Sequence, residues 1–181
     1  RLNTEKVLLK VLPNIKDELS ANSYKQIIEN VENDNRLELL IFICSVPRME
    51  AKKLLLELAQ IEKELNFHEH KWLIKALGAV QLPELIAPLQ EMTASAGEIQ
   101  LELIIHSMLQ FDQEKAVEHL IDFAIDNIKT RKNINIIFKI LREIKVEHLD
   151  SAKFEQLHNL IVKQHHNALL EELYNLQTRI K

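Results

Sequence analysis

The stretch from residue 71 to residue 111 constrains the fold most strongly. Its apolar residues recur at steps of three and four, with one break at Pro83 and another at Gly97. This spacing is typical of helices that bury one face, whereas a half-buried strand alternates apolar and polar residues. The stretch therefore predicts three successive helices. A helix pair of this kind cannot cover its apolar faces alone, so we expect similar pairs on both sides.

Similar breaks occur along the whole chain. They fall near Pro13, Pro47, Pro83, Asp112 and Glu147, at steps of 34, 36, 29 and 35 residues. A period of this length is typical of stacked helix pairs. The 181 residues include only two glycines and four prolines, which is too few for the turns of a sheet. We therefore predict an all-α fold of about five helix pairs in one repeat domain, residues 1–181.

The first pair is predicted to be truncated. Residues 1–12 read as a second helix whose apolar side chains Val7, Leu8, Val11 and Leu12 have no preceding partner helix. Nearest-neighbour packing stabilises repeat arrays, so an uncovered terminal helix frays first. We expect the chain to belong to a longer protein, and an upstream extension to raise its thermal stability.

Capping residues predict where the helices begin. A Ser, Thr, Asp or Asn side chain can accept hydrogen bonds from the free amides of the first helical turn. Proline is tolerated in that turn because its missing amide would stay unpaired anyway. The predicted caps are Thr4, Asp34, Asn66, Asp112, Thr130 and Asp150 or Ser151, with Pro83 in a first turn.

The central repeat resembles the HEAT repeat family. The likeness lies in Pro83, Leu85, Ile86 and Leu89 in the first helix, Ile99 and the apolar ladder after it, and the ending Ala76-Leu77-Gly78 of the repeat before. Gln100 stands where the family commonly has arginine, so the chain resembles a divergent member. The resemblance implies a right-handed α-α superhelix that binds proteins as a scaffold or adaptor, with its second helices lining the concave side.

Polar stripes on those second helices are the candidate partner-binding site. At 100° per residue, the apolar side chains of the helix predicted at 131–145 share one face, and the polar ones fall in a narrow wedge opposite. A solvated surface explains most such stripes, and a binding surface is the alternative. The candidate residues are Lys71, Lys75, Glu102, His106, Arg131, Asn135, Lys139 and Arg142.

No pattern of reaction chemistry stands out, so we predict a protein that is not an enzyme and needs no cofactor or metal. His68 and His70 are two residues apart and point about 200° apart on a helix, so they cannot hold one ion from the same face. Cys44 lies in an apolar run, where a thiol behaves as a small hydrophobe. A single cysteine forms no internal disulfide, which fits a cytoplasmic protein. A soluble domain whose N-terminal anchor lies upstream fits equally.

Charge decides between the possible partners. The net charge of -4 argues against a general binder of nucleic acid, whose affinity depends on Lys and Arg neutralising phosphates. We therefore expect a protein or peptide partner, and no run of apolar residues is long enough to span a membrane. The alternatives are a HEAT-like nucleic-acid-binding domain and a regulatory domain of a membrane-tethered protein. The basic residues that favour nucleic acid are Lys129, Arg131, Lys132, Lys139, Arg142 and Lys145. The oligomeric state is left open.

Overall fold

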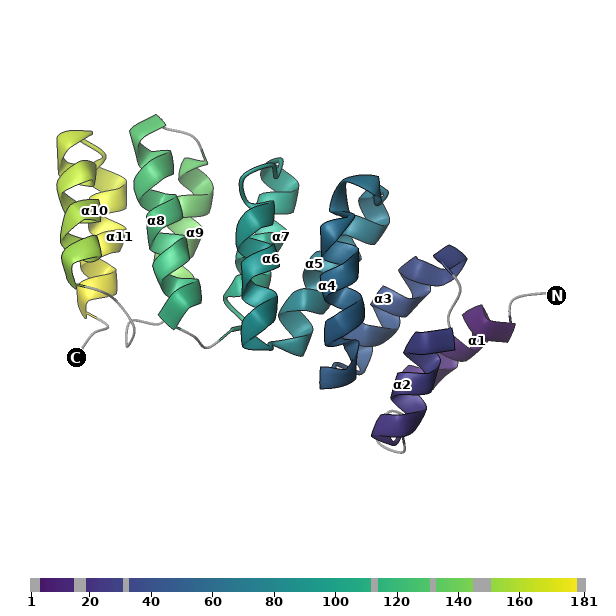
Figure 1. Cartoon of the computed structure of the whole chain (residues 1–181). Coiled ribbons are helices and arrows are strands. Elements are labelled where there is room, and N and C mark those ends of the chain that lie inside the picture. The colour runs from purple at the N-terminus through teal and green to yellow at the C-terminus, as the bar shows by residue number, and fades with distance from the viewer. Residues whose placement is uncertain are drawn as a thin grey trace. The chain divides into compact units, whose positions relative to one another are not determined.

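The computed structural model describes residues 4–14, 19–30, 33–111, 114–130, 133–144 and 151–178. These residues form eleven α-helices and contain no strand, so the prediction of an all-α fold is confirmed. Two compact units divide the chain, Arg1–Gln110 and Phe111–Lys181 (Figure 1). None of the described helices is long and apolar enough to cross a bilayer.

The first unit is built from two layers of helices. Its described residues form α1 (Thr4–Val11), α2 (Ala21–Asn30), α3 (Arg36–Ser45), α4 (Lys52–Gln60), α5 (Phe67–Val80), α6 (Ile86–Met92) and α7 (Glu98–Met108). Helices α1, α3, α5 and α7 form one layer, in which each helix packs against the next. The other layer contains α4 and α6, which both lie against α5, and α2, which contacts the turn that opens α4 (Figure 1).

The core of the first unit lies between these layers. Helices α3, α5 and α7 contribute fully buried side chains such as Phe42, Leu73 and Ile104. Tyr24 from α2 stacks on Phe42 with ring centroids 5.3 Å apart. Burying one such side chain contributes about 1.5–3 kcal/mol, so the layer interface holds the unit together. At the other end of the layer, Val7, Leu8 and Val11 of α1 are about half exposed.

The second unit repeats the two-layer arrangement. Its helices are α8 (Glu114–Thr130), α9 (Ile134–Glu143), α10 (Ser151–Lys163) and α11 (Asn167–Thr178). Helix α8 packs against α10, and α9 packs against α11. The pairs α8–α9 and α10–α11 are also in contact, so each pair contributes one helix to each layer.

Polar pairs link neighbouring repeats inside each unit at a nearly constant sequence spacing. In the first unit Lys52 pairs with Glu84, 32 residues later, and His70 bonds Gln100, 30 residues later. In the second unit Asp122 pairs with Lys153 and Arg142 with Glu172, at spacings of 31 and 30 residues. Equivalent positions of successive helix pairs therefore touch, as expected for a repeat of about 30 residues.

The structure tests several of the predicted caps. The cap predicted at Asn66 is confirmed. The Asn66 side chain accepts hydrogen bonds from the backbone amides of His68 and Glu69, and the Glu69 carboxylate accepts one from the backbone amide of Asn66. The cap predicted at Asp34 is wrong, because residues Asn33–Asn35 form a 3₁₀ turn and α3 begins only at Arg36. The cap predicted at Thr130 is also wrong, because α8 continues to Thr130 and α9 begins only after Asn133, whose φ is 54°.

The remaining boundary predictions have mixed outcomes. Pro83 occupies a first helical turn as predicted, in the 3₁₀ turn Pro83–Leu85 that leads into α6. Thr4 and Ser151 are the first residues of α1 and α10 rather than caps before them. The predicted caps Asp112 and Asp150 lie outside the described residues.

Candidate partner-binding ridge

Two close contacts fix α5 beside α7. Near the start of both helices, the Gln100 amide nitrogen lies 2.8 Å from His70 Nδ1. Near their ends, Gly78 faces Ser107 so closely that a Cβ built on the glycine would lie 2.7 Å from the serine Cβ and 2.9 Å from its Cα. Because both contacts join residues about 30 apart, the two helices run parallel with their exposed faces side by side.

Four of the predicted site residues lie on these exposed faces. Lys71 and Lys75 are partly exposed on α5, and Glu102 and His106 are exposed on α7. The buried side chains of both helices, among them Leu73 and Leu101, lie on their other faces. We call the set Lys71, Lys75, Glu102 and His106 the α5–α7 ridge.

Packing against Trp72 helps to position the Lys75 side chain on the ridge. The Lys75 ammonium lies 4.5 Å from the centre of the Trp72 ring, a cation–π contact. Trp72 is partly exposed, and its carbonyl oxygen lies 3.8 Å from the Cys44 sulfur of α3. Burial raises the pKa of Cys44 to about 12, although the charge of Lys75 opposes the shift. Cys44 is therefore a neutral thiol beside the ridge.

Two apolar side chains at the start of the ridge were missed from the sequence. Phe67 in the first turn of α5 is 53% exposed, and Ile99 in the first turn of α7 is 69% exposed. Helical spacing assigned Ile99 to the apolar ladder of α7, but the face that it shares with Glu102 and His106 points to solvent. The positions of Phe67 and Ile99 in the first turns of α5 and α7 could have revealed this exposure, because a side chain at the end of a helix can extend past the neighbouring helix. Phe67 and Ile99 add an apolar end to the charged ridge.

Three more of the predicted site residues lie in the second unit, on α9. Asn135 and Arg142 are exposed and Lys139 is partly exposed. Ile137, Leu141 and Ile144 are buried as the helical spacing predicted, together with Ile136 and Ile140, while Ile134 and Phe138 remain partly exposed. Arg131 lies outside the described residues, as do Lys132 and Lys145 of the basic cluster. The candidate residues thus form two sets, one in each unit.

Arg142, which the sequence placed in the polar wedge of this helix, contacts a neighbouring helix. Its Nε and Nη2 atoms lie 2.8 Å and 2.7 Å from one Glu172 oxygen of α11, and its guanidinium lies 5.7 Å from the centre of the Phe138 ring. The hydrogen bonds that Arg142 donates to Glu172, together with the negative charge of Glu172, raise the pKa of Arg142. The Glu172 side chain is only 17% exposed. Arg142 therefore joins two helices of the second unit besides contributing to its surface.

The described residues offer no cluster of three His, Cys, Asp or Glu side chains that could hold a metal ion. His68 is exposed, whereas His70 points inward to Gln100, so the two histidines diverge as helical geometry required. The chemistry that the ridge can support is recognition through charges, hydrogen bonds and apolar contact.

Comparison with models of protein families, with curated proteins and with solved structures finds no match to this chain.

Proposed function

We propose that the chain is a non-catalytic interaction module that binds a protein or peptide along the α5–α7 ridge. The observation that carries the proposal is the juxtaposition of exposed apolar side chains, Phe67 and Ile99, with four charged or polar ones on two adjacent parallel helices. Protein interfaces combine an apolar centre with a polar rim, and aromatic side chains are enriched among the residues that dominate affinity. Lysines and a glutamate at the rim would steer a partner into one orientation.

We further propose that the chain folds as a right-handed α-α superhelix of the HEAT type. Support comes from the layers inside each unit and from the polar pairs spaced by 30–32 residues. A cytoplasmic location rests only on the single Cys44 and stays a prediction.

A partner-capture experiment with charge-reversed variants tests the proposed function. The ridge variant is Lys71→Glu/Lys75→Glu, and the matched control is Lys25→Glu/Lys53→Glu, which reverses two exposed lysines of α2 and α4 in the same unit. Proteins captured from the source cell by wild type but not by the ridge variant are purified and titrated. We expect the ridge variant to weaken binding about tenfold, since each rim charge is worth up to about 1 kcal/mol, and the control to leave it unchanged.

A second variant separates apolar recognition from charge steering. Ile99→Ser removes an exposed side chain with little effect on folding and should accelerate dissociation, whereas the lysine reversals should mainly slow association. Equal loss of binding in ridge and control variants would contradict the proposed site. Labelled duplex DNA and RNA run in parallel test the alternative, because a nucleic-acid binder loses affinity steeply between 50 and 200 mM salt.

A further inference from the structure

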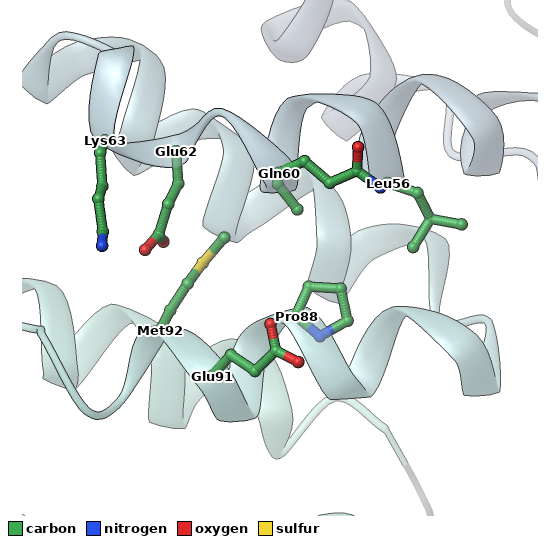
Figure 2. Close-up of a pocket in the computed structure, with 8 residues that line it drawn as sticks. Leu56, Gln60, Glu62, Lys63, Pro88, Glu91 and Met92 are labelled. Carbon is green, nitrogen blue, oxygen red and sulfur yellow. The ribbon is translucent and has the colours of Figure 1, made fainter.

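The other layer of the first unit contains a pocket that the α5–α7 ridge does not include. It lies between α6 on one side and the end of α4 with the turn Glu62–Glu64 on the other, and its volume is about 380 Å³. This volume is at the lower end of the range for ligand pockets, about 300–1,000 Å³. Apolar atoms come from Leu56, Ala59, Pro88 and Met92, and polar atoms from Gln60, Glu62, Lys63 and Glu91 (Figure 2).

Glu62 is the unusual member of this pocket. Its side chain is only 19% exposed, and one carboxylate oxygen, Oε2, is buried without a hydrogen bond. His70 Nε2 lies 3.5 Å from this oxygen, which is an electrostatic contact rather than a hydrogen bond. In Figure 2 the carboxylate extends from its wall toward Met92.

Gln100 holds His70 in place behind the pocket. Its amide nitrogen lies 2.8 Å from His70 Nδ1, and its oxygen accepts from the Gly97 amide at 3.2 Å.

The remaining charges around the pocket leave it acidic. Glu91, on the α6 wall, is exposed, and Lys63 is exposed and forms no ion pair with Glu62 in the described part of the chain. Two carboxylates and one lysine thus line a space whose floor includes the buried Met92 and the Pro88 ring. A complementary occupant carries a positive charge at its tip and an aliphatic stem behind it.

We propose that this pocket binds an arginine side chain of a partner protein. The stem would pack on Met92 and Pro88, and the guanidinium would bond Glu62 and Glu91. Arginine fits better than lysine because its five donors are fixed in a plane and can reach acceptors on several walls, and because it sheds water more readily. The site lies on the layer of α4 and α6, so it is independent of the proposed ridge.

The three methionines of the chain provide the measurement. With ¹³C-methyl-methionine labelling, Met92 reports on the pocket, while the exposed Met49 and the buried Met108 serve as references. The probe is N-acetyl-arginine-methylamide, compared with the lysine analogue and with the neutral citrulline analogue at constant salt. We expect the arginine probe to shift Met92 saturably, the lysine probe to bind several-fold more weakly, and citrulline to leave the signal unchanged.

Variants of the chain decide whether the carboxylates are responsible. Glu62→Gln/Glu91→Gln keeps the shape of both side chains and should weaken the arginine probe at least tenfold, whereas Glu57→Gln on the exposed side of α4 should not. Lys63→Ala should strengthen binding if that lysine competes for the same carboxylates. An unperturbed Met108 signal confirms that each variant is folded. The proposal is overturned if Met92 does not shift, if citrulline shifts it equally, if lysine binds as tightly as arginine, or if the double variant binds as wild type does.

Discussion

At the scale of single residues, burial controls the chemistry of the side chains beside the proposed site. Cys44 is the only cysteine of the chain, and desolvation raises its pKa to about 12. Only the thiolate reacts with disulfide reagents. We expect 5,5′-dithiobis(2-nitrobenzoate) at pH 8 to modify the native protein at least about 100-fold more slowly than the protein unfolded in guanidinium. Similar rates in both states would show that the contact with Trp72 does not shield the thiol.

His119 of α8 gives the fold a predicted sensitivity to acid. Burial lowers its pKa below the usual 6.5 and outweighs Asp122, which raises it, while Lys153 also lowers it. The unfolded chain therefore binds this proton at a higher pH than the folded chain does. The contribution of neutral His119 to stability is present above about pH 6.5 and is lost as the pH falls toward the lower, folded pKa.

A glutamine at this position should remove part of that acid sensitivity. We expect the melting temperature of His119→Gln to fall less steeply than that of wild type between pH 7 and pH 5. His68→Gln is the control, because His68 is exposed and the change removes no buried imidazole. The same decrease of melting temperature with pH in wild type and His119→Gln would contradict the predicted role of His119.

At the scale of elements, the contact between α5 and α7 leaves no room for a methyl group. Alanine is a better helix former than glycine by about 1 kcal/mol, yet a Cβ at Gly78 would press on the backbone and side chain of Ser107. Overpacking typically costs about 1–3 kcal/mol. We therefore expect Gly78→Ala to destabilise the protein in urea unfolding.

The other glycine is a matched control for this prediction. Gly97 is exposed at the cap position of α7, and a Cβ there would contact only the Gln100 oxygen at 3.8 Å. A serine at a helix cap is slightly better than glycine, so Gly97→Ser should change stability by no more than about 0.5 kcal/mol. If Gly78→Ala is as stable as wild type, α5 and α7 do not approach as closely as described.

The pair Arg142–Glu172 provides the corresponding test in the second unit. Arg142→Glu places two carboxylates where α9 meets α11 and should lower the melting temperature. The swapped variant Arg142→Glu/Glu172→Arg restores opposite charges and should recover most of the loss. The sequence alone indicated only a polar surface position for Arg142, which gives no reason to expect this loss. An unchanged melting temperature for the single reversal would show that the pair contributes nothing to stability.

Local signals decided which elements could be predicted from sequence. The apolar spacing and the cap at Asn66 placed α5 correctly, because both depend on residues within one helix. The start of α9 was misplaced, because Thr130 has the side chain of a cap while the backbone of α8 continues through it. The Glu62–His70–Gln100 contacts were not foreseen, because they join three elements. Pairs of complementary polar residues about 30 positions apart were the signal that could have revealed part of this network.

At the scale of the whole molecule, the proposed superhelix extends to the entire chain an arrangement that is established only inside each unit. The layers and polar pairs are established within Arg1–Gln110 and within Phe111–Lys181. That the whole chain forms a superhelix stays a prediction from the HEAT likeness and from the repeated spacing of these pairs.

Small-angle X-ray scattering of the monomeric protein tests this central claim most directly. A compact globule of 181 residues has a radius of gyration of about 16 Å. A superhelix that stacks its helix pairs in one direction is longer, so we predict a radius well above that value and one rigid shape over a range of salt concentrations. A radius near 16 Å, or a scattering profile that only a freely moving pair of units can fit, would contradict the continuous superhelix.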